Sequence, residues 1–342
     1  MTERPFLTVA IPAYNRAHWL PQLLDSALAQ QFADWDCVIV EDSSPERPQI
    51  RAAAQRYAQK HPGRFTYHEN DRNLGYDGNF RRLVELARGR YVFIMGNDDL
   101  IAPGAFSAVA RAHAMEPEMG LLLRTYAMFR GSPDDVEQVS RYYPSPRVFA
   151  PGAEAIVACY RRLSDMSGLV LHRDDAVKAA SDRWDGHCFY QHWLALNLLL
   201  HRPAVFLPDI LAYFRRDGTP DFGNAEAERE RFSPGGYSDA TQVQMVRSQL
   251  EIARGTVPQH YPALERDYAN YVFPTLAHLQ HDGGPAFEQR VRELASLGLD
   301  RYTAFHAWVW AVRLFGARRL SRLFRALRRI IGHTPNLTRA AR

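Results

Sequence analysis

Two adjacent carboxylates, Asp98 and Asp99, follow a short apolar run at residues 91–95 and are the side chains best suited to chemistry in this chain. The apolar run predicts a buried strand of a parallel sheet. Open α/β sheets bind ligands beyond the carboxyl ends of their strands, so acids at this point can meet a ligand. Neighbouring carboxylates repel each other unless a cation or hydrogen-bond donors compensate them, and a divalent metal holding a diphosphate would do so. A second interpretation is that both acids only cap the helix after Pro103.

Apolar and helical patterns alternate over the first hundred residues, and polar side chains follow each apolar segment. This β-α-β-α-β-α-β order predicts a parallel sheet in an α/β fold. Neither G-x-G-x-x-G after the first strand nor G-x-x-x-x-G-K is present, which argues against a dinucleotide-binding fold and a P-loop nucleotidase. The expected strands cover residues 7–11, 36–40, 64–68 and 91–95, and the expected helices cover 18–30, 48–60 and a segment ending near 87.

The turns that follow these strands carry groups suited to a nucleotide. The turn at 12–16 joins a strand to a helix N-terminus, where Tyr14 can stack on a base and Arg16 can meet phosphate. Asp42 can accept a hydrogen bond from a base or a ribose hydroxyl. Residues 70–79 are too polar and glycine-bearing for a core, so we expect a loop there. The alternative for the first turn is that Asn15 is only a helix cap.

Several ordered motifs together resemble the signature of family 2 glycosyltransferases with the GT-A fold. Within that family they look most like the branch that contains abequosyltransferases and other O-antigen sugar transferases. The resemblance covers residues 5 to about 216. The segments that carry it are 11–16 (IPAYNR), 40–44 (VEDSS), 73–79 (NLGYDGN), 87–91 (ARGRY) and 95–99 (MGNDD).

This resemblance implies an inverting transfer from a nucleoside-diphosphate sugar, assisted by Mn²⁺ or Mg²⁺. Asp99 matches the family's metal ligand and Asp98 its ribose-binding acid, while Asn97 stands where a second carboxylate would be expected. The sequence does not choose between the two metals. The residues that the resemblance assigns to the nucleotide sugar, with the arginines that we add to them, are Pro12, Ala13, Tyr14, Arg16, Asp42, Arg72, Asn73, Gly75, Asn79, Asn97, Asp98 and Arg215.

Inversion requires a general base that takes the proton of the acceptor hydroxyl. The family usually supplies an aspartate in a Glu-Asp pair near the start of a helix, and Gln191-His192 stands in that position here. We expect His192 to be the base, because an imidazole has a suitable pKa near neutral pH. Asp185 in the preceding loop is the second candidate. The remaining interpretation is that His192 is a core or surface histidine without a catalytic role.

Length and composition predict a soluble protein with a catalytic domain and an appendage. We assign residues 1–216 to an α/β catalytic domain, 217–238 to a flexible loop that can close over the donor, and 239–342 to a helical region. Residues 204–207 and 210–214 are expected to form edge strands, and 166–173 a strand beneath the site. Three widely spaced cysteines and the absence of a secretory signal favour a reduced, cytoplasmic protein.

The positive charge lies at the C-terminal end of the chain. The net charge is +4, and residues 301–342 carry ten arginines and no Asp or Glu. Helices are expected at 239–254, 258–280, 285–296 and from 304 onward. Within the last helix, apolar residues share one face and arginines occupy most of the rest, which is typical of a helix lying on an anionic membrane. The alternative is that the apolar face, within residues 313–331, packs on the helical region.

We therefore expect a cytoplasmic enzyme, peripheral on the inner face of the cytoplasmic membrane, that adds one sugar to a lipid-linked surface glycan. A homodimer is compatible with the sequence, and no nucleic-acid-binding motif is present. A sugar-phosphate nucleotidyltransferase is a competing class, but its glycine-rich, lysine-bearing loop is not seen near the N-terminus. A non-catalytic glycan- or membrane-binding member of the fold is the third possibility, supported only by the altered Glu-Asp position.

Overall fold

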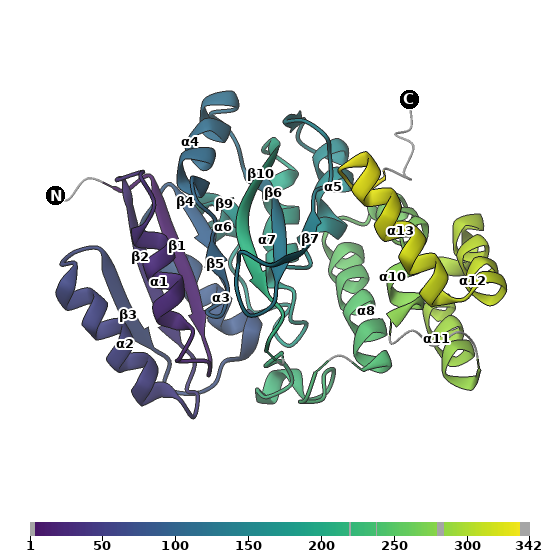
Figure 1. Cartoon of the computed structure of the whole chain (residues 1–342), viewed down its shortest axis with the longest axis horizontal. Helices are drawn as coiled ribbons and strands as arrows, with labels where there is room; N and C mark the ends of the chain where they lie inside the picture. The colour runs from purple at the N-terminus through teal and green to yellow at the C-terminus, as the bar shows by residue number, and fades with distance from the viewer. Residues whose placement is uncertain (1–3, 219, 237, 279–283, 336–342) are drawn as a thin grey trace. The chain divides into compact units, whose positions relative to one another are not determined.

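The computed structural model describes residues 4–218, 220–236, 238–278 and 284–335 (Figure 1). By its internal contacts the chain divides into two units, residues 1–235 and 236–342. The division falls inside the loop expected at 217–238, so most of that loop belongs to the first unit.

One mixed sheet organises the described part of the first unit (Figure 1). Its strands are β1 (Leu7–Ala13), β2 (Trp35–Glu41), β3 (Phe65–Glu69), β4 (Tyr91–Ile94), β5 (Leu100–Ile101), β6 (Leu121–Phe129), β7 (Val136–Ser140), β8 (Arg147–Phe149), β9 (Leu169–His172) and β10 (Ala204–Arg215). The order is β3-β2-β1-β4-β9-β6-β10-β5, with β7 on β6 and β8 on β10. β1 to β4 pair in parallel, as do β6 and β10, whereas β9 is antiparallel to both β4 and β6. The expected mainly parallel α/β sheet is confirmed.

The two edge strands expected near residues 204–214 are wrong, because the segment forms one long strand inside the sheet. β10 pairs with β6 along one side and with β8 and β5 along the other. The register of β10 shifts between Phe206 and Ile210, around Pro208, which has no N–H to donate. The short strand β5 was not expected. It begins directly after Asp99 and therefore fixes the end of the turn that carries the two acids.

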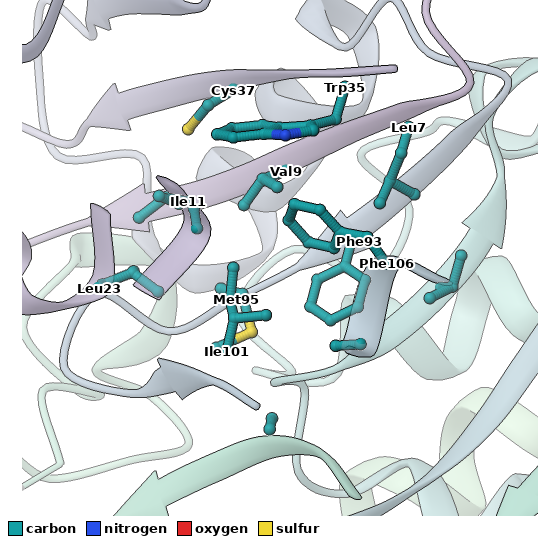
Figure 2. Packing of buried hydrophobic residues seen from close by; sticks show 14 of the residues in the cluster. Leu7, Val9, Ile11, Leu23, Trp35, Cys37, Phe93, Met95, Ile101 and Phe106 are labelled. Carbon is teal, nitrogen blue, oxygen red and sulfur yellow. The ribbon is translucent and has the colours of Figure 1, made fainter. Parts of the chain in front are cut away.

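Helices in the crossovers bury the apolar side chains of the central strands. They are α1 (Leu20–Leu28), α2 (Arg47–Lys60), α3 (Gly75–Leu86), α4 (Ala105–Met115), α5 (Ala153–Cys159), α6 (Arg173–Ala179) and α7 (Tyr190–Leu199). Alternate residues of β1, Leu7, Val9 and Ile11, point to one face and share a buried apolar cluster with Phe93 of β4 and Phe106 of α4 (Figure 2). This fully buried layer holds β1 and β4 side by side and so fixes the relative positions of their polar ends.

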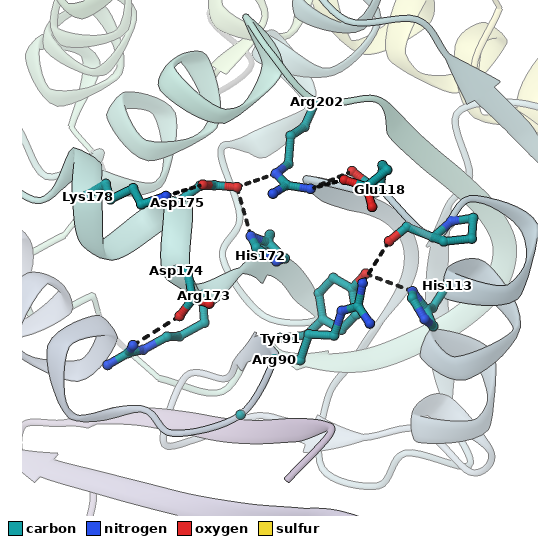
Figure 3. Close-up of polar contacts among 12 residues, drawn as sticks. Arg90, Tyr91, His113, Glu118, His172, Arg173, Asp174, Asp175, Lys178 and Arg202 are labelled. Atoms are coloured by element: carbon teal, nitrogen blue, oxygen red, sulfur yellow. Dashed lines mark hydrogen bonds and ion pairs between the residues drawn. The ribbon is translucent and has the colours of Figure 1, made fainter. Parts of the chain in front are cut away.

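At the opposite end of the sheet, the polar side chains of His172 and the adjacent loops and helix pair with one another. Nδ1 of His172, at the end of β9, lies 2.8 Å from Oδ2 of Asp175 (Figure 3). Arg202 pairs with the same Asp175 carboxylate and reaches Glu118 at 2.8 Å. These groups satisfy one another, so the polar groups at the carboxyl ends of β1, β2 and β4 are the better candidates for ligand binding.

The second unit is helical in its described residues. Its helices are α8 (Asp239–Thr256), α9 (Tyr261–Asn270), α10 (Phe273–Leu276), α11 (Pro285–Ser296), α12 (Thr303–Phe315) and α13 (Ala317–Ile331). The single helix expected at 258–280 is two helices as far as residue 278, because Pro274 is tolerated only in the first turn of a new helix. The helix expected from 304 onward divides at Gly316, whose φ of 76° interrupts the helix. Residues 279–283 lie outside the described residues. None of the described helices is both long and apolar enough to cross a membrane.

Candidate active site

The turns after β1 and β4 are joined by an ion pair. Nη1 of Arg16 lies 2.7 Å from Oδ2 of Asp98, and Nε of Arg16 lies 2.9 Å from Oδ2 of Asp221. Asn15 and Arg16 both adopt the left-handed backbone region, with φ of 53° and 59°. Such strain is costly for residues with a side chain and is concentrated at functional sites in proteins. The turn thus holds a half-buried guanidinium between two carboxylates at the ligand-binding edge of the sheet.

The two adjacent acids have different surroundings. Asp99 is 2% exposed, its Oδ1 accepts the backbone N–H of Arg215 at 2.8 Å, and its Oδ2 accepts the hydroxyl of Ser167. Burial and the neighbouring charge of Asp98 hold the pKa of Asp99 well above its usual range. Burial also raises the pKa of Asp98, although Arg16 opposes that shift. Asp98 is therefore the more accessible acid, and the structure does not favour Asp99, the expected metal ligand, as a group that reaches a ligand.

The missing side chain of Gly96 leaves room for the carboxylates of Asp98 and Asp99 close to the backbone of the turn. A Cβ at this position would lie 3.1 Å from Oδ2 of Asp99 and 3.2 Å from Oδ1 of Asp98. The N–H of Gly96 donates to Oγ of Ser167 at 2.9 Å, so one serine links the backbone of the turn to the buried carboxylate. Asn97 donates from Nδ2 to the carbonyl of Asn15 at 2.8 Å. Asn97 is buried and ties the turn after β4 to the turn after β1, which is a positioning role.

Arg215 lies beside the acids, but its donors are occupied by the protein. Its Nε donates to the carbonyl of Asp98 at 2.8 Å and its Nη2 to Oε1 of Gln22 at 2.7 Å. The guanidinium carbon also lies 5.1 Å from the ring centre of Trp19 and 4.7 Å from that of Phe129. Arg215 is buried, so the expectation that it touches a diphosphate is not supported in this structure. It supports the backbone of Asp98 instead.

Asp42, at the end of β2, holds the start of α3. Its Oδ1 accepts from Nδ2 of Asn70 at 2.8 Å and from the N–H of Leu74 at 2.9 Å, and its Oδ2 accepts from the N–H of Gly75 at 2.9 Å. Burial raises the pKa of Asp42 to about 6 despite these hydrogen bonds. Its oxygens are committed to the protein, which disagrees with the expected contact to a nucleobase. The helix therefore starts at Gly75, within the loop expected at 70–79.

The remaining residues expected to bind nucleotide lie on the same turns with unequal exposure. Asn79 is buried, with Nδ2 3.2 Å from the carbonyl of Val40, so it is a packing residue of α3. Tyr14 is half-buried and shares a hydrogen bond with Asn73, and partial burial raises its pKa. Arg72 is exposed. Pro12 is half-buried and Ala13 is buried.

The segment after β10 packs against these turns. Glu228 is 3% exposed and accepts from the N–H of Tyr76 and the N–H of Gly223, each at 2.7 Å. A Cβ on Gly75 would lie 2.8 Å from Oε1 of Glu228, and a Cβ on Gly186 would collide with the carbonyl of Ala227. Two glycines with positive φ thus permit this approach. With Asp221 on Arg16, the segment is held over the strand ends at two carboxylates.

His192, the expected general base, is in the protein core. It is fully buried, and its two ring nitrogens have no hydrogen-bond partner among the described residues. Its ring meets those of Tyr160 and Phe189 edge-on at 4.9 and 5.2 Å. Burial lowers the pKa of His192 to about 3, so the ring is neutral and a poor proton acceptor. The expectation is therefore corrected, because the first turn of α7 faces inward and not toward a ligand.

Asp185 lies in the loop before α7 and keeps partial exposure. Its two oxygens accept from Nη1 and Nη2 of Arg81 at 2.6 and 3.0 Å. Gln191, which precedes His192 in α7, is also buried. Its Oε1 accepts the hydroxyl of Tyr76 at 2.9 Å, and its Nε2 donates to the carbonyl of Leu163 at 3.1 Å. Of the two candidate bases, only Asp185 has a side chain that solvent reaches, with 26% exposed.

Sequence reasoning missed Ser167, Asp221 and Glu228 as members of the site. Ser167 stands in the segment that we expected to lie under the site, so its position was open to inference although its hydrogen bond to Asp99 was not. Asp221 and Glu228 fall in a stretch without periodic pattern, and nothing in their sequence context indicates which turns they contact.

Comparison with known proteins agrees with this fold. Residues 8–153 match the model of glycosyl transferase family 2. An uncharacterized protein of Mycobacterium tuberculosis is 29% identical over 66% of this chain and 72% of its own length. The abequosyltransferase RfbV of Salmonella typhimurium is 31% identical, over 28% of this chain and 29% of RfbV. The mannosyltransferase PcManGT of Pyrobaculum calidifontis, solved with GDP-Man and Mn²⁺, superposes with a TM-score of 0.52 at 18% identity, over 92% of this chain and 88% of that one.

The structural likeness shows the GT-A fold, and the matches together support an enzyme of the glycosyltransferase class. The match to the glycosyl transferase family 2 model covers residues 8–153, which include the motifs at residues 11–16 and 95–99.

Proposed function

We propose that the enzyme moves a sugar, with inversion, from a nucleoside-diphosphate sugar to an acceptor hydroxyl. The observation that carries the proposal is the position of Arg16 between Asp98 and Asp221, at the edge where open α/β sheets bind their ligands. A guanidinium pairs with phosphate oxygens as readily as with carboxylates. The diphosphate of the donor takes the place of Asp221 at Arg16, while Arg72, Tyr14 and the nearby turns bind the rest of the nucleotide.

A divalent cation fits this corner through Asp98. Mg²⁺ and Mn²⁺ are commonly held by one or two carboxylates together with phosphate oxygens of the substrate. Burial raises the pKa of both Asp98 and Asp99, and the neighbouring charge of Asp98 raises that of Asp99 further, so a cation bound here would favour their charged forms. The described residues contain no cluster of three His, Cys, Asp or Glu that could hold a metal unaided, so the donor would complete the site. When bound, the cation offsets the charge that develops on the leaving diphosphate.

Asp185 is the proposed general base. Its carboxylate is partly exposed and is held by Arg81 in a bidentate pair, which sets the direction of its oxygens. An inverting transfer needs one base on the side of the sugar opposite the diphosphate. Asp185 accepts the proton of the acceptor hydroxyl as that oxygen attacks the anomeric carbon.

The acceptor is proposed to be a hydroxyl of a lipid-linked surface glycan. The support is the resemblance of residues 73–79 and 95–99 to the O-antigen branch and the match to an abequosyltransferase. Under this proposal the enzyme works in the cytoplasm as a peripheral protein on the inner face of the cytoplasmic membrane. A homodimer is compatible with the proposal, and no nucleic-acid partner is part of it.

Nucleotide binding tests the proposal directly. The melting temperature of the full chain should rise with at least one of UDP, GDP, CDP and dTDP, and rise further when Mn²⁺ is added, because a ligand that binds only the folded state stabilises it. Arg16→Gln should remove most of this shift. Arg111→Gln is the matched control, since Arg111 forms an exposed pair with Asp209. No shift with any nucleotide, or equal shifts in both variants, would reject the proposal.

A further inference from the structure

Exposed apolar side chains are concentrated on α12 and α13. Of the eleven large apolar side chains that are exposed among the described residues, seven lie between residues 310 and 331. They are Trp310 (63%), Leu314 (62%), Phe315 (57%), Leu323 (63%), Leu327 (39%), Ile330 (82%) and Ile331 (37%). Soluble proteins seldom expose such a group of residues without a partner for it.

One side of the apolar face expected on α13 packs on the helical unit, and the other side is exposed to solvent. Leu320 is 8% exposed, and the ring of Phe324 lies 5.0 Å from that of Phe273 and 5.2 Å from that of Trp308. These two positions, four residues apart, attach α13 to its own unit. Leu323, Leu327 and Ile330 follow the i, i+4, i+7 spacing of a helix face and remain exposed. Packing on the helical unit therefore accounts for only one side of the face.

Arginines border the exposed side. α13 carries six of them (Arg318, Arg319, Arg322, Arg325, Arg328 and Arg329), and residues 301–342 contain no Asp or Glu. On α12, Arg313 pairs with Glu288 of α11 at 2.8 Å. A partner for this surface must therefore accept apolar side chains and supply negative charge around them.

We propose that the exposed side of α12 and α13 docks on an anionic lipid bilayer, with Leu323, Leu327, Ile330 and Trp310 entering the interface. Charge complementarity favours lipid over a second copy of the chain, because a symmetric dimer interface brings each patch against itself and would set arginine against arginine. Apolar residues in the acyl boundary and arginines at the headgroups satisfy both requirements. This inference rests on the proposed function only for its purpose, which is to bring the enzyme to a lipid-linked acceptor.

Flotation of the full chain with vesicles tests the docking surface. Binding is expected to vesicles of phosphatidylcholine that contain phosphatidylglycerol, and to weaken strongly on pure phosphatidylcholine. Leu323→Gln/Leu327→Gln/Ile330→Gln should lower the partition coefficient by at least about tenfold. The matched control is Val136→Gln/Val139→Gln/Val148→Gln, which removes three exposed apolar residues of β7 and β8 and should bind as wild type.

The charge requirement is tested by a second variant. Arg322→Gln/Arg325→Gln/Arg329→Gln should lower binding to anionic vesicles by roughly a hundredfold, since each arginine near such a surface contributes about fivefold. Equal binding of wild type and both triple variants would overturn the proposal. So would a loss of dimer, seen by light scattering, in place of a loss of vesicle binding.

Nucleotide-induced thermal shifts separate this inference from the proposed function. They should be the same in wild type and in both α13 variants, because none of the substituted residues belongs to the first unit. A chain that binds nucleotide but not vesicles contradicts only the docking surface. A chain that binds vesicles but no nucleotide contradicts only the proposed function.

Discussion

Nη1 of Arg16 lies 2.7 Å from Oδ2 of Asp98, so a half-buried ion pair joins the turn after β1 to the turn after β4. The buried layer of Val9, Ile11 and Phe93 holds these strands together, and Asn97 adds a backbone contact between the turns. These contacts fix the position of the Arg16 guanidinium, although an arginine side chain is flexible by itself. A ligand that binds Arg16 meets a group already in place, which lowers the entropic cost of binding.

Asp98→Asn should mainly reduce activity, whereas Asp99→Asn should mainly reduce stability. Asp98→Asn is expected to lower kcat by about two to three orders of magnitude and to remove the effect of Mn²⁺ on nucleotide binding, with little change in stability. Asp99→Asn is expected to lower the free energy of unfolding by about 1–3 kcal/mol, because it disturbs the buried contacts to Ser167 and the N–H of Arg215. Urea denaturation and turnover assays measure both effects. The reverse pattern would return the metal to Asp99.

Asp221→Asn should tighten the binding of nucleoside diphosphates. Asp221 pairs with Nε of Arg16, and a neutral amide in its place removes the negative charge that competes with phosphate for the guanidinium. The expected gain in affinity is about threefold to tenfold, which corresponds to roughly 1 kcal/mol. Isothermal titration calorimetry gives the dissociation constants. Asp209→Asn, which breaks the exposed pair with Arg111, is the control and should leave affinity unchanged; weaker binding by Asp221→Asn would show that Asp221 helps to hold the nucleotide.

His192→Phe should keep full activity and change the pH dependence of stability. The pKa of His192 is about 3 in the folded chain and about 6.5 when unfolded. The unfolded chain therefore binds the extra proton between these values, and folding stability falls as pH drops through this window by up to about 1.4 kcal/mol per pH unit. The phenylalanine variant loses this component.

Comparison of unfolding curves from pH 7 to pH 4 measures the difference between His192→Phe and wild type. At pH 7 the variant should be as stable as wild type or more stable, because an unpartnered polar group is removed from the core. His201→Phe, at an exposed position, should retain the wild-type pH dependence. A large loss of kcat in His192→Phe with unchanged stability would restore the histidine as the base.

Asp185→Asn should lower kcat while nucleotide binding is kept. General-base catalysis contributes about 10²- to 10⁴-fold, so turnover should fall within that range. The amide can still accept one hydrogen bond from Arg81, which limits the loss of stability. Asp182→Asn changes an exposed residue of the same loop and should retain wild-type turnover. Normal turnover in Asp185→Asn would leave the reaction without its proposed base.

The order of strands and helices was predictable because it follows local patterns. Apolar runs at residues 7–11, 36–40 and 91–95 formed β1, β2 and β4, and polar residues came at their ends as expected. Two predictions of element boundaries were wrong. The last helix was predicted to be continuous but divides at Gly316, and the two strands predicted at 204–207 and 210–214 are one strand that continues through Pro208. Such positions interrupt a sequence pattern, but the outcome depends on what neighbouring elements provide.

The sequence by itself indicated the family resemblance, the parallel strands and the set of turns that carry polar groups, because each depends on residues close together along the chain. Only the tertiary structure decided which polar groups face a ligand. Asp98 and Asp99 are neighbours of the same type, yet in the turn between β4 and β5 Asp99 contacts Ser167 while Asp98 lies beside Arg16. Packing between segments far apart in the sequence buries His192 in the core and places Asp221 beside Arg16. Burial and charge pairing are properties of such contacts, and so they set the chemistry that the sequence left open.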